Sequence, residues 1–271
     1  MPVATYTVDV PSHDQVEVTF GDVGLGRPIL LLHGGAGSRS VASFAQLLDS
    51  RGRFRVLSPI HPGFDGTPRP GWLGTVDGLA QVYARLLDQL ELTGVTVIGS
   101  SLGGWIAAEL ALRDGGRRVS GVVLVDGVGI VVEGHPVADV FSLSPDQLSR
   151  LSFHDPAAFS IDPTTLSDAQ KAVVAANRAA LAVYGGRPST GDPTLLGRLG
   201  RIALPTLVVW GESDRVVDPG YGRALAAAIP GASFQLIPGA GHLPQLEAPG
   251  PLLAAVRTFV DAHHPAGPRQ V

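Results

Sequence analysis

The sequence of 271 residues contains no cysteine. A disulfide framework and a catalytic thiol are therefore both excluded, and covalent catalysis would need another nucleophile. The sequence also has no long basic run, and its formal net charge is −4. This balance argues against a nucleic-acid-binding surface. A small-molecule substrate is the partner that fits the composition best.

Long hydrophobic runs are missing as well. No stretch is long enough to span a bilayer, and the N-terminal MPVATYTVDV lacks the basic and apolar regions of a secretory signal. We therefore expect a cytoplasmic protein with no membrane partner. The 45% hydrophobic and 16% charged residues are typical of a globular protein, and the length suits one large domain or one domain with an insertion. The sequence leaves the oligomeric state open between monomer and homodimer.

Short β-branched runs alternate with amphipathic helical stretches, which is the pattern of a parallel sheet with helices on both faces. The first two runs alternate apolar and polar residues and predict an antiparallel edge hairpin. Helices are expected at Val76 to Leu90 and from Leu102 to about Arg113. We predict an α/β fold with eight strands, at Tyr6 to Val10, Val16 to Phe20, Ile29 to Leu32, Arg55 to Ser58, Val95 to Ile98, Val122 to Val125, Thr206 to Trp210 and Phe234 to Ile237.

The interval between the sixth and seventh expected strands is much longer than one crossover helix requires. It contains the helix start Ser144-Pro145-Asp146 and a longer helical stretch from Ser167 to Tyr184. We interpret residues 129–200 as an inserted helical cap, and residues 1–128 and 201–271 as the α/β core domain.

The cap is expected to form the roof of a substrate pocket. Its few charges indicate a mainly apolar pocket, with His135, His154 and Arg178 as the polar candidates. Its large apolar side chains could face either the substrate or the cap's own core, and most are expected in that core. They are Phe141, Leu148, Leu151, Phe153, Phe159 and Tyr184.

The stretch GSSLGG, residues 99–104, fits the G-x-S-x-G motif around Ser101. It lies between an expected strand and an expected helix, which is the context that this motif requires. A nucleophile on such a tight turn has a strained backbone, and side chains two residues before and after it would collide with neighbouring backbone. Gly99 and Gly103 avoid both collisions, so Ser101 is the candidate nucleophile. A glycine-rich turn capped by serine is the alternative interpretation.

A serine hydroxyl needs a base, and the base needs an orienting acid. Asp214 follows the expected strand Thr206 to Trp210 and is the candidate acid. His242 follows the expected strand Phe234 to Ile237 and is the candidate base. The order Ser, Asp, His along one sheet edge is the order that this arrangement uses. Asp126, at the end of an earlier strand, is the alternative acid, or it could cap a turn.

Together these motifs resemble the α/β-hydrolase fold family, over nearly the whole chain. The resemblance implies that the backbone amides of Gly35 and Leu102 stabilise an oxyanion, and a glycine at position 35 allows close approach of the substrate. Ser101 in place of an aspartate speaks against the haloalkane dehalogenase and epoxide hydrolase branches, whose chemistry begins with a carboxylate. The matching pieces are Leu32-His33-Gly34-Gly35, Pro62-Gly63-Phe64-Asp65-Gly66, GSSLGG, GESDRVV and GAGHLPQLE.

Two other histidines, His33 and His61, lie near the expected site and are interpreted as structural loop residues. No histidine pair has the i, i+4 spacing of a zinc site with a following ligand. The glycine-rich HGGAG stretch lacks the lysine of a phosphate-binding loop. We therefore expect neither a metal ion nor a cofactor.

The sequence predicts a serine hydrolase of the carboxylesterase type, which cleaves a small or medium-sized ester through an acyl-enzyme intermediate. A carbon–carbon bond hydrolase of the ring-cleavage type is the alternative within enzymes, because such relatives share the serine triad and an HGG loop. The residue after His242 is Leu243, where those relatives often have tryptophan. An alternative from another class is a ligand-binding sensor or scaffold that retains the hydrolase fold.

Overall fold

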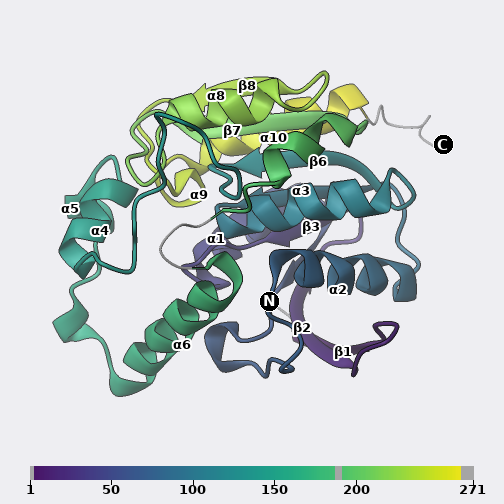
Figure 1. Cartoon of the computed structure of the whole chain (residues 1–271), viewed down its shortest axis with the longest axis horizontal. Coiled ribbons are helices and arrows are strands. Elements are labelled where there is room, and N and C mark those ends of the chain that lie inside the picture. The colour runs from purple at the N-terminus through teal and green to yellow at the C-terminus, as the bar shows by residue number, and fades with distance from the viewer. Residues whose placement is uncertain (1–2, 187–190, 264–271) are drawn as a thin grey trace.

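A twisted sheet of eight strands forms the centre of the molecule, in the order β1-β2-β4-β3-β5-β6-β7-β8 (Figure 1). The computed structural model describes residues 3–186 and 191–263. The strands are β1 (Val3–Val8), β2 (Val16–Val23), β3 (Arg27–Leu32), β4 (Phe54–Pro59), β5 (Val95–Ser100), β6 (Val119–Val125), β7 (Thr206–Gly211) and β8 (Ser233–Ile237).

The sheet is mostly parallel, as predicted. Strand β2 pairs antiparallel with β1 and with β4, and all the other neighbouring strands run parallel. The expected start of the first strand was wrong by three residues. Val3 already pairs with Gly21, and the ladder ends where Val8 pairs with Val16, so the residues that follow form the connection to β2 rather than the end of a strand.

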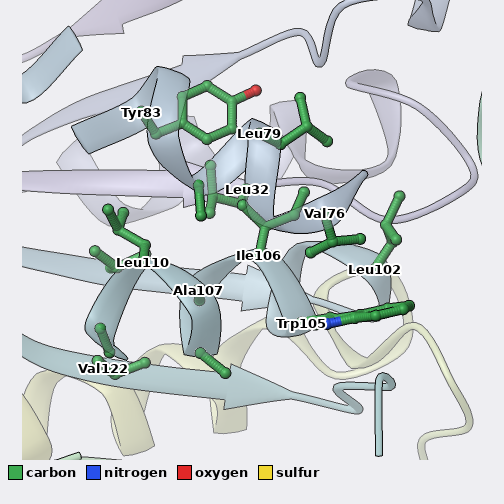
Figure 2. Close-up of a cluster of buried hydrophobic side chains, with 14 of the residues drawn as sticks. Leu32, Val76, Leu79, Tyr83, Leu102, Trp105, Ile106, Ala107, Leu110 and Val122 are labelled. Atoms are coloured by element: carbon green, nitrogen blue, oxygen red, sulfur yellow. The ribbon is translucent and has the colours of Figure 1, made fainter. Parts of the chain in front are cut away.

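Helices cover both faces of the sheet because successive buried residues of each strand point to opposite sides. On one face, α2 (Val76–Gln89), α3 (Leu102–Asp114) and α8 (Pro219–Ala227) pack with Leu30 and Leu32 of β3. Figure 2 shows this core where α2 and α3 meet. On the other face, α1 (Arg39–Asp49) and α10 (Pro249–His263) pack with Ile29 and Leu31. The α/β class and its strand number are therefore confirmed.

The segment between β6 and β7 is helical. Ser144 and Ser167 each accept a hydrogen bond from the third residue of the following helix, and both starts carry the reciprocal glutamine contact of a capping box. Helices α4, α5 and α6 lie together at the left of Figure 1. The elements of this segment are α4 (Pro145–Ser152), α5 (Pro156–Phe159), η2 (Pro163–Thr165), α6 (Asp168–Gly185), α7 (Leu195–Arg198) and η3 (Leu199–Arg201).

The division into core and cap remains a prediction, and residues 1–2, 187–190 and 264–271 of those segments lie outside the described residues. None of the helices in the described ranges is both long and apolar enough to cross a membrane.

Helix α6 is attached to the core at two points. The Asn177 amide donates to Asp65 Oδ1 at 2.9 Å, and the Asn177 carbonyl oxygen accepts from the Asp65 backbone N–H at 2.6 Å. Asp65 lies in the short 3-10 turn η1 (Phe64–Gly66), with φ of 50°. Two turns further along, the Tyr184 hydroxyl donates to the Pro62 carbonyl at 2.8 Å. These bonds hold α6 against the segment that follows β4.

Candidate active site

Ser101 lies on the sharp turn between β5 and α3, with φ of 54° and ψ of −115°. Glycine is required two residues before and two residues after Ser101, because a side chain at either position would collide with backbone atoms. A Cβ at Gly99 would lie 2.1 Å from the Gly103 carbonyl oxygen, and a Cβ at Gly103 would lie 2.3 Å from the Leu32 carbonyl oxygen. The strained conformation that exposes the Ser101 hydroxyl is therefore possible only with glycine at both positions.

The structure brings Ser101, His242 and Asp214 together at the carboxyl ends of three strands. His242 Nε2 lies 2.9 Å from Ser101 Oγ, and His242 Nδ1 lies 2.7 Å from Asp214 Oδ2. His242 and Asp214 are both buried. With Nδ1–H donating to the carboxylate, Nε2 can accept the serine proton.

Asp214, and not the alternative acid Asp126, is hydrogen-bonded to His242. Asp214 Oδ1 also accepts from the backbone N–H groups of Val216 at 2.9 Å and Val217 at 3.1 Å. Asp126 is fully buried, and its Oδ1 accepts from the Gly211 N–H at 2.8 Å. Burial, and then the charge of Asp214, raises the pKa of the Asp126 carboxyl well above its usual value.

The loop that carries His242 is fixed from two sides. The His242 backbone N–H donates to the Ser152 carbonyl at 2.7 Å, which joins the loop to the end of α4. Glu247, at the end of α9 (Pro244–Glu247), accepts from the Gly241 N–H at 2.6 Å and from the His154 N–H at 2.8 Å. Sequence reasoning gave Glu247 no role. The only signal for it was the acidic residue in the quoted stretch GAGHLPQLE.

The backbone amides of Gly35 and Leu102 lie beside Ser101 in the wall of the same cavity. In the described part of the chain, neither amide donates a hydrogen bond to another residue. Leu102 is the first residue of α3, where backbone N–H groups have no partner within the helix. Gly34 is also close, because a Cβ there would lie 2.9 Å from the Cβ of Ser101. The amides of Gly35 and Leu102 could therefore bind an oxyanion formed at Ser101.

The cavity above Ser101 has a volume of about 370 Å³ and is mainly apolar. Of the three polar residues considered from the sequence, Arg178 lines the cavity, whereas His135 and His154 do not. The Arg178 guanidinium donates a hydrogen bond to the Phe141 carbonyl. His135 Nδ1 instead binds Asp218 at 2.8 Å, and His154 Nδ1 lies 2.8 Å from Ser213 Oγ. The apolar lining residues are Ala36, Leu102, Val128, Val137, Val140, Phe141, Leu148, Ile161, Val174, Leu181, Val216 and Leu243.

His33 and His61 are stacked beneath the Gly34-Gly35 loop, with ring centroids 3.8 Å apart. His33 Nε2 accepts from the His61 backbone N–H at 3.1 Å, and His33 Nδ1 donates to the Gly34 carbonyl at 2.7 Å. Burial lowers the pKa of His33 to about 4, and burial and then the charge of His33 lower the pKa of His61 well below its usual value. Both rings are therefore neutral structural groups, consistent with the interpretation from the sequence.

One group of acidic and histidine side chains among the described residues could share a metal ion. It consists of Asp126, Asp214 and His242, with one ligand atom of each within 4.8 Å of the others. Two of these atoms already form the hydrogen bond between Asp214 and His242.

Comparison with known proteins identifies relatives with several activities. The chain is 28% identical over 201 residues to the epoxide hydrolase EphH of Mycobacterium tuberculosis, covering 68% of this chain and 94% of that one. It is 28% identical over 250 residues to a 2-hydroxy-6-oxononadienedioate/2-hydroxy-6-oxononatrienedioate hydrolase of Cupriavidus pinatubonensis, covering 83% and 84% of the two chains.

Among solved structures, a thermophilic esterase from Thermogutta terrifontis superposes with a TM-score of 0.73 at 26% identity, covering 96% of this chain and 99% of the other. Residues 29–256 match the family model described as the alpha/beta hydrolase family. This match includes Ser101, Asp214, His242 and residues 129–200, and it does not include β1 and β2. The chain therefore belongs to the alpha/beta hydrolase family.

Proposed function

We propose that the protein is a serine hydrolase that cleaves a carboxylic ester of small to medium size. The observation that carries this proposal is the continuous hydrogen-bonded chain from Ser101 through His242 to Asp214, with distances of 2.9 Å and 2.7 Å. This chain of hydrogen bonds starts at a partly exposed serine on a strained turn and ends at a buried carboxylate, which is the arrangement that activates a serine for acyl transfer.

In the proposed mechanism, Ser101 Oγ attacks the ester carbonyl carbon while His242 Nε2 takes the hydroxyl proton. Asp214 holds the imidazole in the tautomer that can accept this proton and stabilises its positive charge. The amides of Gly35 and Leu102 bind the oxyanion of the tetrahedral intermediate. His242 then returns the proton to the departing alcohol, and a water molecule releases the acid from Ser101 by the same route.

The cavity supports an apolar acyl group. Its lining is mainly aliphatic, and Arg178 is the one charged side chain among the described residues that line it. An apolar group in such a cavity gains about 25 cal/mol for each Å² removed from water, whereas a charged group loses its hydration without a full set of partners. Neutral acyl groups are therefore favoured over dicarboxylates.

Carbon–carbon bond cleavage is the second candidate because of the similarity to the hydrolase of Cupriavidus pinatubonensis. By its name that relative acts on a dicarboxylate, which the mainly apolar cavity does not favour. Epoxide opening is not proposed, because the resemblance described above gives that branch a carboxylate nucleophile and this chain has Ser101 there.

A substrate panel tests the proposal directly. It contains p-nitrophenyl esters of increasing acyl length, a vinylogous diketone and a lactone, each assayed with the wild type and with Ser101→Ala. We expect steady hydrolysis of the esters, well beyond one equivalent, and at least a thousandfold loss in Ser101→Ala. Faster cleavage of the diketone than of every ester would favour the second candidate. A single turnover with no steady rate would favour a ligand-binding protein.

A further inference from the structure

Asp126 is a buried carboxyl group to which the proposed mechanism gives no role. Its backbone is in the left-handed region, with φ of 46°, and its N–H donates to the Val209 carbonyl of β7 at 2.9 Å. This conformation is costly for a residue with a side chain, so the surroundings have to enforce it. It directs Asp126 Oδ1 to the N–H of Gly211, the last residue of β7.

The turn around Asp126 also contacts the nucleophile. The Ser101 N–H donates to the Val125 carbonyl at 2.9 Å, and the Val128 N–H donates to the Ser101 carbonyl at 3.2 Å. Asp126 thus joins the turn that holds Ser101 to the strand that leads into Asp214. It does not line the cavity, so it has no contact with substrate.

The carboxyl groups of Asp126 and Asp214 are too close for both to be ionised. One oxygen of each lies within 4.8 Å of the other and of a His242 ring nitrogen, and all three residues are buried. Two like charges at such a distance, away from water, raise the pKa of one member of the pair. The proton therefore has to be placed on one of the two carboxyls.

The hydrogen bonds decide which carboxyl keeps the charge. Asp214 accepts three hydrogen bonds, two from backbone N–H groups and one from His242. Asp126 accepts one, from Gly211, and within residues 3–186 and 191–263 no donor is directed at its buried Oδ2. Three donors stabilise an anion far better than one, so the charge belongs on Asp214 and the proton on Asp126.

We propose that Asp126 is a neutral carboxylic acid whose Oδ2–H donates to Asp214, which makes Asp126 a positioning residue for the hydrogen-bonded chain that ends at Ser101. The catalytic part of this proposal rests on the proposed function. The added donor fixes the Asp214 carboxylate against rotation, and the single remaining negative charge lies on the carboxylate next to His242.

All but one of the groups that face Asp126 raise the pKa of its carboxyl, which favours the protonated form. Burial has the largest effect on the pKa of Asp126, and the charge of Asp214, a hydrogen bond with Asp214 and the charge of Glu247 raise it further. The Gly211 N–H is the group that lowers it. His242 faces the same pair of carboxyls but directs its Nδ1–H at Asp214.

The first test measures unfolding and needs no activity. An aspartate in an unfolded chain has a pKa of about 3.9, so above about pH 4 Asp126 is ionised in the unfolded chain and takes up a proton on folding. The unfolding constant of the wild type should therefore rise with pH relative to that of Asp126→Asn, by up to tenfold per pH unit from about pH 4 to the raised pKa. Asp126→Asn needs no proton, and its amide can form both hydrogen bonds.

Asp162→Asn is the matched control. Asp162 is an exposed carboxylate that accepts hydrogen bonds from the Thr164 N–H and the Thr164 hydroxyl, and these two bonds lower its pKa. The ratio of its unfolding constant to that of the wild type should be constant above about pH 5. The proposal would be overturned if the ratio of the unfolding constants of the wild type and Asp126→Asn were also constant above about pH 5. So would a loss of wild-type stability in EDTA, because a cation shared by the two carboxylates would then replace the proton.

The second test uses the pH profile of kcat/KM on the best p-nitrophenyl ester. Asp126→Asn should stay within about threefold of the wild type with the acid limb of its profile unmoved. Asp126→Ala, which lacks the donor, should lose tenfold or more in kcat with little change in KM. If Asp126 were ionised, Asp126→Asn would remove a negative charge near His242 and move the acid limb to lower pH. If no ester is hydrolysed by the wild type, the proposed function fails, while the unfolding test still decides the protonation of Asp126.

Discussion

The replacement Asp214→Asn tests the role of Asp214 most sharply, because the surrounding backbone dictates how the new side chain lies. Two backbone N–H groups, of Val216 and Val217, donate to Asp214 Oδ1. They need an acceptor, so the asparagine carbonyl oxygen will take that place and its NH₂ group will take the place of Oδ2. That NH₂ then faces His242 Nδ1, which lies 2.7 Å from Oδ2 in the native site. A donor at this position makes Nδ1 the acceptor and puts the ring proton on Nε2, facing Ser101.

The expected loss follows from the cost of restoring the productive tautomer. Returning the proton to Nδ1 breaks the neutral hydrogen bond between the asparagine NH₂ and Nδ1, worth about 0.5–1.5 kcal/mol, and leaves two buried donors facing each other, at about 1–3 kcal/mol. The middle of this range, about 3 kcal/mol, corresponds to a loss of more than about a hundredfold in kcat, at 1.36 kcal/mol for each factor of ten. We expect KM to change little, because Asp214 does not line the cavity.

The assay is steady-state hydrolysis of the best ester, with circular dichroism as the check that the variant is folded. Asp218→Asn is the control, since Asp218 lies four residues further along, binds His135 and also loses one charge on substitution. It should retain wild-type kcat. Folded Asp214→Asn with more than a tenth of the wild-type kcat would refute the argument about the tautomer.

Three further predictions concern other parts of the site. A fluorophosphonate probe should label the wild type and Ser100→Ala but not Ser101→Ala, as judged by mass spectrometry of the labelled peptide; persistent labelling of Ser101→Ala would exclude Ser101 as the nucleophile. Burial lowers the pKa of His33 to about 4 and also lowers that of His61, so the unfolded chain takes up more protons at these two residues than the folded chain does in acid. Their contribution to stability should be fully present above about pH 6.5 and fall from there towards pH 4, by up to about 1.4 kcal/mol per pH unit for each histidine. Asp126→Asn is the protein to use, because the opposing proton uptake by Asp126 is absent from it. Urea unfolding at closely spaced pH values measures this, and a flat curve between pH 6.5 and 4 would contradict it. Glu247→Gln should destabilise the protein by about 1–3 kcal/mol and lower kcat more than it raises KM, because one of the two oxygens that accept backbone N–H groups is replaced by a donor; an unchanged kcat in a destabilised variant would limit Glu247 to a structural role.

The nucleophile turn could be predicted from the sequence because its constraints are local. Gly99 and Gly103 lie two residues on either side of Ser101, and the backbone contacts that exclude a Cβ at these positions are formed within the turn and with the adjacent strand β3. The positions of Asp214 and His242 followed from a different regularity, since parallel strands bring their carboxyl ends to one edge. The strand number and the helix starts at Ser144 and Ser167 could be predicted for similar reasons.

Contacts between distant segments could not be predicted in this way. Glu247 binds backbone N–H groups of Gly241 and of His154, and the second of these lies 93 residues away along the chain. Backbone N–H groups are the same in every residue, so no pattern of side chains indicates which ones a carboxylate will meet. The sequence offered Asp126 and Asp214 as competing acids, but the protonation state of such a pair depends on how many donors each receives in the folded chain.

Two attachments of the predicted cap, one through α4 and one through α6, have a consequence for protein engineering. The Ser152 carbonyl at the end of α4 accepts a hydrogen bond from the His242 backbone N–H. Helix α6 is held through Asn177 to Asp65, which also accepts from the Ser38 backbone N–H, three residues after Gly35. A cap transplanted from a relative to change substrate preference would therefore replace one partner in each of these contacts. Such a chimera should stay active only if the exchanged segment leaves Ser152 and Asn177 in place. Otherwise the transplanted cap has to supply an acceptor at the end of its first helix and an amide facing Asp65. Exchange of single lining residues, such as Leu181 or Val174, leaves both contacts in place and is the safer way to reshape the pocket.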